Sequence, residues 1–362
     1  IPGTLAPLSE VLKTRPKLLA GKAMTMRLAH VYEDYAVMRE EALAIAAASL
    51  GDSKKPDEWT ARGMAFLYLG DADKALEALE KALRFDRQST EALTARAQVW
   101  RMKGYGLKAL ADLDEAVLKA PRNALYRFQR AIILTEMKER DKAVTDITTA
   151  LRLNKNYYFA FGLLGSVFAG KGDLARAMKS YDKALDIEPE YHYARLGRAA
   201  VRLAKGDKEG ALSEYDAVLK ANPKHFGATY NKAEALMDAG RRDEALETYR
   251  AALSCDIPDA SHAAILGDRL SSVLLWREAI EAYTAAYALS KHPAHLLKRS
   301  AAHEVLKDND LALKDLDQAV AADPDLARAW ALRGTLAAKM GNEKQALADL
   351  SRAFRIDYKN VD

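Results

Sequence analysis

Alanine returns along this chain at an interval of 34 residues, with a single interval of 33 between Ala279 and Ala312. A repeat of this length predicts a solenoid of stacked helical or mixed units, each of which contacts only its neighbours. The chain has 362 residues, which is too long for one compact core, but a solenoid escapes that limit. We therefore expect function to reside on an extended surface. The recurring residues are Ala75, Ala109, Ala143, Ala177, Ala211, Ala245, Ala279, Ala312 and Ala346.

Aligned on that alanine, the sequence from residue 56 to residue 360 divides into consecutive units with one shared pattern. The preceding residues, 1–55, do not follow this pattern clearly. They are interpreted as an N-terminal helical extension or a degenerate capping repeat. Terminal parts of repeat arrays need an atypical outer face, so capping is the expected role of this extension. The nine units are 56–89, 90–123, 124–157, 158–191, 192–225, 226–259, 260–292, 293–326 and 327–360.

Small and large apolar residues recur at fixed positions within the units. The eighth position is always Gly, Ala or Ser, the twentieth is always Ala, and positions 21 and 24 carry large apolar side chains. Such spacings predict a buried helical stripe in which large residues pack against small ones. Six units have Gly near position 15, and Gly readily adopts the left-handed conformation that ends a helix. The fold class is therefore predicted to be all-α, built from tandem helix-turn-helix repeats.

Charged residues at positions 7 and 23 vary together. Five units have Arg at position 7 and an acid at position 23, two units have an uncharged residue at both, and Arg62 and Lys232 do not fit. We predict a partly buried salt bridge between the two helices of a unit, with a structural role. The expected pairs are Arg96 with Asp112, Arg130 with Asp146, Arg198 with Glu214, Arg299 with Asp315, and Arg333 with Asp349.

The composition excludes several classes of protein. The net charge of +4 comes from interspersed residues of both signs, and no apolar run approaches the length that spans a membrane. Cys255 is the only cysteine, so no intrachain disulfide can form. We expect a soluble protein without membrane insertion, in the cytoplasm or the periplasm. The chain begins at Ile1, which is consistent with a cut from a longer chain or with a removed leader.

The sequence contains no recognisable group of catalytic or metal-binding residues. There is no phosphate-binding glycine loop and no zinc-protease motif. His295 and His303 would lie about 12 Å apart along a helix, too far to share one ion. We expect no enzyme activity, no cofactor and no metal. Nucleic-acid binding is also not expected, because the recurring charges are predicted to pair with one another and leave no continuous basic strip.

The residue pattern of 56–360 resembles the tetratricopeptide repeat family. The resemblance rests on the small eighth residue, Ala at positions 20 and 27, an aromatic residue or Leu at 24, Pro at 32, and Trp59 and Trp330 at position 4. It implies a right-handed superhelix whose first helices line a concave groove. Carried over residue by residue, the inward positions that we select as a candidate partner-binding groove are Met64, Tyr68, Arg101, Phe128, Ile132, Phe159, Tyr193, Leu196 and Tyr230.

The middle of that groove is expected to be apolar and aromatic, with Tyr157, Tyr158 and Tyr191 at its rim. Exposed apolar patches of this kind usually mark an interaction site, although the superhelix or the N-terminal segment could cover them. Some members of the family hold acidic tails of heat-shock chaperones with a clamp that needs Asn at position 9. No unit has that Asn, so we do not expect chaperone tails as ligands.

These observations predict a non-catalytic scaffold that binds an extended or helical peptide segment of a partner protein in its concave face. The alternative is a regulatory or substrate-docking arm of a larger enzyme or assembly. Self-association through the C-terminal edge is a further possibility. In the seventh unit Leu274 replaces the turn glycine and Trp276 follows, which suggests a hinge over residues 268–280, with ordinary sequence drift as the alternative.

Overall fold

The structure is a computed structural model that describes residues 35–47 and 53–359. All regular elements in these residues are α-helices, and one isolated bridge joins His225 to Asp256. The expected all-α class is confirmed. The chain forms two compact units, Ile1–Ala194 and Arg195–Asp362, which are described in turn.

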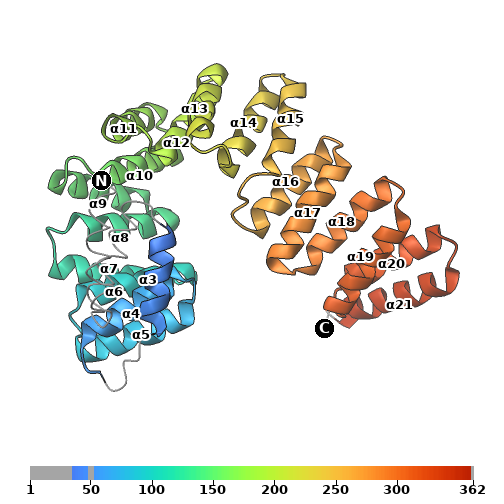
Figure 1. The fold of residues 1–362 in the computed structure, drawn as a ribbon, viewed down its shortest axis with the longest axis horizontal. Helices are drawn as coiled ribbons and strands as arrows, with labels where there is room; N and C mark the ends of the chain where they lie inside the picture. The colour runs from blue at the N-terminus through green and yellow to red at the C-terminus, as the bar shows by residue number, and fades with distance from the viewer. Residues whose placement is uncertain (1–34, 48–52, 360–362) are drawn as a thin grey trace. The chain divides into compact units, whose positions relative to one another are not determined.

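The first unit contains one leading helix and then helices that pack in consecutive pairs. Each pair joins two helices through a short turn, so the partners run in opposite directions (Figure 1). The helices are α3 (Tyr35–Ala47), α4 (Pro56–Tyr68), α5 (Ala72–Phe85), α6 (Thr90–Met102), α7 (Gly106–Lys119), α8 (Ala124–Glu136), α9 (Arg140–Leu153), α10 (Tyr158–Gly170) and α11 (Leu174–Ile187).

The second unit continues the same arrangement, and α12 begins at the end of the first unit. The expected repeat boundaries, the count of nine repeats and the right-handed superhelix stay predictions. The helices are α12 (His192–Ala204), α13 (Lys208–Ala221), α14 (Phe226–Asp238), α15 (Arg242–Ala252), α16 (Ala260–Ser272), α17 (Trp276–Ser290), α18 (Pro293–Val305), α19 (Asn309–Ala322), α20 (Ala327–Lys339) and α21 (Glu343–Lys359).

The turn inside each pair closes the first helix with a left-handed residue. After α4, Gly70 has a φ of 81°, its N–H donates to the carbonyl of Leu67, and the N–H of Asp71 donates to the carbonyl of Phe66. This is the Schellman motif, which satisfies the last carbonyls of a helix. Gly104, Gly172, Gly206, Gly240 and Gly341 adopt the same conformation, and so do Lys138, Leu274 and Lys307.

The turn at Leu274 keeps the geometry of the other turns. Its φ is 68°, and the N–H of Leu275 donates to the carbonyl of Leu270 at 2.9 Å. The local turn is therefore formed without glycine, and the hinge over 268–280 stays a prediction about motion.

The core consists of the side chains at the repeat positions that carry small or large apolar residues. Ala75, Ala109 and Ala143 are fully buried, and the glycine at position 8 allows the second helix to approach closely. A methyl group on Gly63 would lie 2.4 Å from the Leu79 side chain, and one on Gly165 would lie 2.6 Å from the Tyr181 ring. Close packing of this kind tolerates neither a larger residue at position 8 nor a smaller one at position 24.

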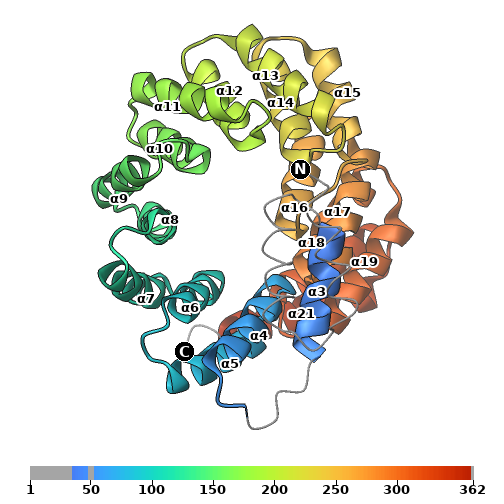
Figure 2. The same cartoon turned by 60° about the vertical axis from the view of Figure 1, so that its left-hand side comes forward.

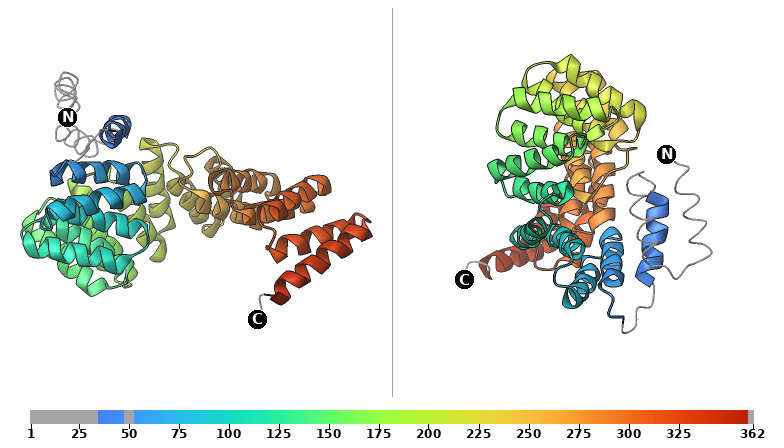
Figure 3. Two further views of the ribbon diagram at one scale, coloured as in Figure 1. Left: turned by 90° about the horizontal axis from the view of Figure 1, so that it is seen from below. Right: turned by 90° about the vertical axis from the view of Figure 1, so that its left-hand side faces the viewer.

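Within the first unit, the first helices of successive pairs share one side. Helix α4 contacts α6, α6 contacts α8 and α8 contacts α10. Figure 2 shows α6, α8 and α10 on the inner side of the curve that this unit follows, with α7, α9 and α11 on the outer side. Helix α3 packs beside α4, as both views of Figure 3 show. The first helices thus offer one continuous inner face.

Candidate binding surface

Six aromatic side chains on the first helices and their preceding connections form a continuous cluster in the first unit. Ring centroids of Phe128 and Tyr157 lie 5.0 Å apart, and those of Tyr158 and Phe159 lie 4.1 Å apart. Further contacts join Tyr157 to Phe159 at 6.3 Å, Phe159 to Tyr191 at 5.3 Å, Tyr158 to Tyr191 at 5.0 Å, and Tyr191 to Tyr193 at 5.8 Å. We call these residues, Phe128, Tyr157, Tyr158, Phe159, Tyr191 and Tyr193, the aromatic surface.

The local structure brings these rings together from three successive pairs. Phe128 lies in the second turn of α8, while Tyr157 and Tyr191 lie in the connections that precede α10 and α12. Gly162, one turn into α10, makes room for the Tyr191 ring, because a methyl group at this glycine would lie 2.7 Å from a ring carbon of Tyr191. This role of Gly162 was not predictable from the repeat pattern, because glycine at that position occurs in one unit only.

The aromatic surface is partly open to solvent. Phe159 exposes 42% and Tyr193 exposes 46% of its surface, whereas Phe128, Tyr157, Tyr158 and Tyr191 are half-buried. Burial raises the pKa of Tyr157 and of Tyr191, so both phenols remain neutral donors at any physiological pH. The surface can therefore offer apolar ring faces together with uncharged hydroxyl groups.

Other residues expected in the groove lie apart from this surface. Met64 and Tyr68 are half-buried in α4 and pack on the cluster that α3 contributes through Ala42 and Ile45. Arg101 is exposed on α6, and its guanidinium pairs with Glu136 at 2.9 Å. Ile132 lies in α8, one turn after Phe128, and is half-buried.

Leu196 and Tyr230 belong to the second unit. Both are partly buried and pack against the core cluster there. The Tyr230 ring lies 5.9 Å from Phe226 and 6.1 Å from Tyr249, and burial raises its pKa to about 12. These two side chains contribute to packing of the second unit and are not part of the aromatic surface.

The five expected salt bridges between positions 7 and 23 are confirmed. Arg96, Arg130, Arg299 and Arg333 each hold their acid by two hydrogen bonds, and Arg198 lies 2.7 Å from Glu214. All five acids are buried. The hydrogen bonds to the acids raise the pKa of the four arginines, which keeps them charged.

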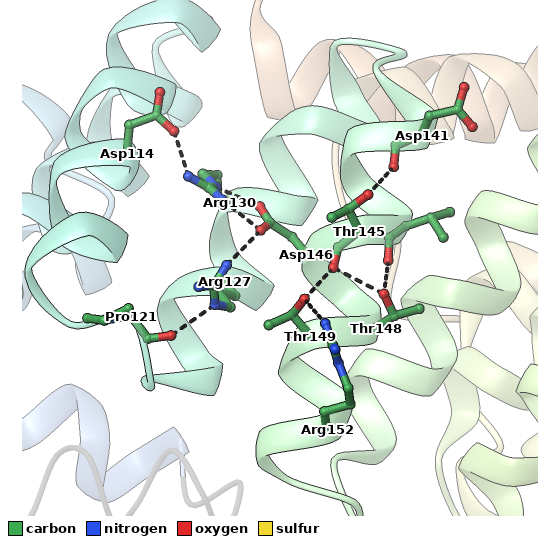
Figure 4. Close-up of polar contacts among 11 residues, drawn as sticks. Asp114, Pro121, Arg127, Arg130, Asp141, Thr145, Asp146, Thr148, Thr149 and Arg152 are labelled. Carbon is green, nitrogen blue, oxygen red and sulfur yellow. Dashed lines mark hydrogen bonds and ion pairs between the residues drawn. The ribbon is translucent and has the colours of Figure 1, made fainter.

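A second acid, at position 25 of the preceding unit, was missed by the sequence reasoning. Arg130 also donates to Asp114 on α7 at 2.9 Å, and Arg333 donates in the same way to Asp317 at 2.8 Å. Figure 4 shows Arg130 between Asp114 and Asp146, with Arg127 of the same helix also pointing toward Asp146. One arginine thus links three successive helices. Acids at position 25 in five of the nine expected units were the available signal.

The histidines of the described residues do not form a metal site. No three His, Cys, Asp or Glu side chains there come close enough to hold an ion. His292 caps α18 by accepting from the N–H of Ala294, and His303 lies 3.9 Å from both Asp308 and Asp315. No helix in this part of the chain is long and apolar enough to cross a bilayer.

Comparison with known families identifies the repeats. Family models described as tetratricopeptide repeat match residues 56–99, 160–191, 194–260 and 327–360. These segments lie in both units, and each covers all or nearly all of at least one of the helix pairs described above.

Two curated relatives match this chain over part of its length. Small glutamine-rich tetratricopeptide repeat-containing protein 2 of Saccharomyces cerevisiae is 30% identical over 99 residues, 25% of this chain and 29% of that protein. Serine/threonine-protein phosphatase T of Trypanosoma brucei brucei is 28% identical over 106 residues, 29% of this chain and 22% of the phosphatase. The chain therefore spans less than a third of the length of these relatives.

Among solved structures, a human IFIT1 dimer with PPP-AAAA has the same kind of fold. Its TM-score is 0.56 at 19% sequence identity, with 98% of this chain and 87% of that chain covered. At this level of identity the likeness concerns the fold alone.

Proposed function

Because this chain is a tetratricopeptide repeat protein, we propose that it is an interaction scaffold that binds a peptide segment of a partner protein on the aromatic surface. Tetratricopeptide repeats are generally scaffolds for protein–protein interaction. The observation that carries the proposal is the unbroken run of six rings at the beginnings of α8, α10 and α12 and in the connections before α10 and α12, with Phe159 and Tyr193 substantially exposed. Packing of the helix pairs does not require these rings at the surface, and aromatic anchors supply much of the affinity at interfaces.

The ligand is proposed to be a protein segment rather than a nucleic acid. A single-stranded nucleic acid needs aromatic rings together with a basic track for its phosphates. Arg101 of α6 pairs with Glu136, and Arg130 of α8 pairs with Asp146 and Asp114, so these two arginines do not form a basic track. An apolar or aromatic peptide in an extended or helical form fits this surface better.

The experiment selects ligands from a random-peptide library displayed on phage, with the full chain as bait. Selected peptides are then titrated against the wild type and against a Phe128→Glu, Phe159→Glu, Tyr193→Glu variant whose fold is verified by circular dichroism. We expect affinity to fall by about tenfold or more, because three anchors become charged.

Phe85→Glu is the matched control, because Phe85 is an aromatic residue of the first unit that exposes 48% of its surface and lies outside the aromatic surface. It should bind the peptides as the wild type does. Equal binding by the triple variant, or a library that yields no shared sequence, would refute the proposal.

A second candidate function is a substrate-docking arm of a larger enzyme. It is favoured by the partial match to a phosphatase, of which the chain covers 22%. The aromatic surface would then hold a substrate protein for a catalytic domain elsewhere. Binding of selected peptides followed by identification of the catalytic partner through cross-linking in the source cells would distinguish an arm from a free-standing scaffold.

A further inference from the structure

Position 4 of a helix pair has a recurring hydrogen bond that fixes its side chain. In three pairs the side chain at this position donates an N–H to the backbone carbonyl six residues earlier. The bonds run from Trp59 to Ser53 at 2.8 Å, from Arg127 to Pro121 at 3.0 Å, and from Trp330 to Pro324 at 2.9 Å.

In the two pairs with tryptophan, an arginine three residues later lies over the indole ring. The Arg333 guanidinium carbon is 4.7 Å from the centroid of Trp330, and that of Arg62 is 5.8 Å from the centroid of Trp59. A cation over an aromatic face is attracted by the ring quadrupole. The chain therefore contains its own template for an indole ring held between a backbone carbonyl and an arginine.

The pair α6–α7 has the same arginine and carbonyl but no indole. Leu93 occupies position 4, and a depression of about 580 Å³ opens beside it. This volume is within the range of ligand-binding pockets. The lining residues are Glu80, Leu83 and Arg84 of α5, Arg87 of the following connection, Leu93 and Arg96 of α6, and Glu115 of α7.

Both groups that would hold an indole are available in this pocket. Arg87 is six residues before Leu93, and among the described residues no hydrogen bond reaches its carbonyl. Arg96 binds Asp112 through Nε and Nη2, at 2.8 and 2.7 Å, while its Nη1 has no partner in the described part of the chain. The equivalent Nη1 atoms of Arg130 and Arg333 are occupied by Asp114 and Asp317.

We propose that this pocket binds a tryptophan side chain of a partner protein. The indole N–H donates to the Arg87 carbonyl, one ring face lies against the Arg96 guanidinium, and the ring edge lies beside Arg84, which also lines the pocket. This arrangement repeats the contacts of Trp330 with Pro324 and Arg333 in the same chain.

The charges of the pocket favour a neutral aromatic ligand. A guanidinium would face three arginines, Arg84, Arg87 and Arg96, and a carboxylate would meet Glu80 and Glu115. An indole carries no charge, keeps one N–H donor and gains from a neighbouring cation. The pocket lies on α5, α6 and α7 and does not include the aromatic surface, so this inference does not depend on the function proposed above.

The test uses fluorinated N-acetyltryptophanamide as the probe, followed by fluorine NMR with the full chain. The wild type should broaden and shift the probe signal in a saturable way. Leu93→Trp fills the pocket from within, and we expect it to weaken probe binding by about tenfold or more. Arg84→Gln, on the rim of the pocket, should weaken binding severalfold without affecting the fold.

Two matched controls separate binding from folding. Leu296→Trp changes the same repeat position, and Leu296 and Leu93 are both buried, but Arg299 Nη1 is already bound to Thr284 whereas Arg96 Nη1 has no partner in the described part of the chain. It should lower the melting temperature, whereas Leu93→Trp should keep or raise it. Arg122→Gln, at an exposed arginine outside the pocket, should leave probe binding unchanged.

Three outcomes would overturn the proposal. The first is unchanged probe binding in Leu93→Trp and in Arg84→Gln, and the second is no binding to the wild type at millimolar probe. The third is stronger binding of N-acetylargininamide than of the tryptophan probe, which would assign the pocket to a cation. If Leu93→Trp fails to fold, Arg84→Gln against Arg122→Gln still decides the question.

Discussion

The guanidinium of Arg130 on α8 holds the carboxylate of Asp146 on α9 by two hydrogen bonds of 2.6 and 2.7 Å. Asp146 exposes 2% of its surface, so its charge depends on this partner, with Arg127 more distant at 3.4 Å. The same arginine reaches Asp114 on α7. The contact therefore joins the two helices of one pair and connects that pair to the one before it.

Removal of Asp146 is expected to destabilise the first unit strongly. Asp146→Ala leaves Arg130 without its buried partner, and breaking a buried ion pair from one side costs about 3 kcal/mol. Arg130→Met should cost a similar amount, because it leaves Asp146 buried with only the more distant Arg127. The measurement is urea unfolding followed by circular dichroism and by hydrogen exchange of amides in α8 and α9.

Asp114→Ala provides the control for that prediction. Asp114 binds the same guanidinium, but 56% of its side chain is exposed. Exposed ion pairs contribute about 1 kcal/mol or less. If Asp146→Ala and Asp114→Ala changed stability equally, burial of the pair would not be the cause.

The salt bridges within pairs were predictable because positions 7 and 23 covary along one sequence. The two exceptions, Arg62 and Lys232, were not explained by that pattern, and the structure explains both. Arg62 lies over the rings of Trp59 and Phe66, and Lys232 pairs with Asp216 of the preceding pair at 2.6 Å. These partners occupy repeat positions other than 23 or lie in a neighbouring pair. The covariation of positions 7 and 23 therefore could not reveal them.

Part of the aromatic surface was predictable from the repeat pattern. Phe128, Phe159 and Tyr193 follow from the family pattern of inward positions, and all three are in the aromatic surface. Met64 and Tyr68 fit the same pattern, yet they pack on the cluster formed by α3. The family pattern describes a single repeat and contains no information about α3, the helix before the first repeat, against which Met64 and Tyr68 pack.

The left-handed turn residues give a prediction about backbone strain. Leu274 has a φ of 68° and exposes 67% of its surface. Packing of its side chain therefore does not offset the strain of the left-handed backbone conformation. Leu274→Gly should therefore raise stability by about 1 kcal/mol. Gly104→Ala should lower it by a similar amount, since a methyl group there meets no atom within 4 Å and only the backbone is strained.

The stability of both variants is measured by thermal unfolding. Hydrogen exchange of the amides across 268–280, measured on the same proteins, tests the hinge. Faster exchange there than in neighbouring turns, slowed in Leu274→Gly, would support a hinge. Exchange no faster than in the neighbouring turns would exclude it.

Two glycines of α10 should respond differently to the same substitution. A methyl group on Gly165 would lie 2.6 Å from the Tyr181 ring, which is 3% exposed between the helices and cannot move away. Gly165→Ala should therefore lower the melting temperature clearly, despite the better helix propensity of alanine.

Gly162→Ala should instead leave stability nearly unchanged and rearrange the aromatic surface. The methyl group would meet the outer end of the Tyr191 ring at 2.7 Å, and that half-buried ring can turn toward solvent. We expect shifted aromatic NMR signals of Tyr191 and Tyr193 and weaker binding of the selected peptides. Unshifted signals would show that Gly162 does not set the position of Tyr191.

Buried tyrosines make the chain sensitive to high pH. Burial raises the pKa of Tyr215 from 10.0 to about 12, and Tyr215 exposes 2% of its surface. The folded state holds the phenolic proton more tightly than the unfolded state does, so the stabilisation is complete below pH 10 and is lost as pH rises toward about 12. Urea unfolding over this window, with phenolate absorbance recorded in parallel, should show stability falling as pH rises. Tyr215→Phe should reduce the slope, because phenylalanine has no proton to lose, and an unchanged slope would assign the loss of stability to other groups.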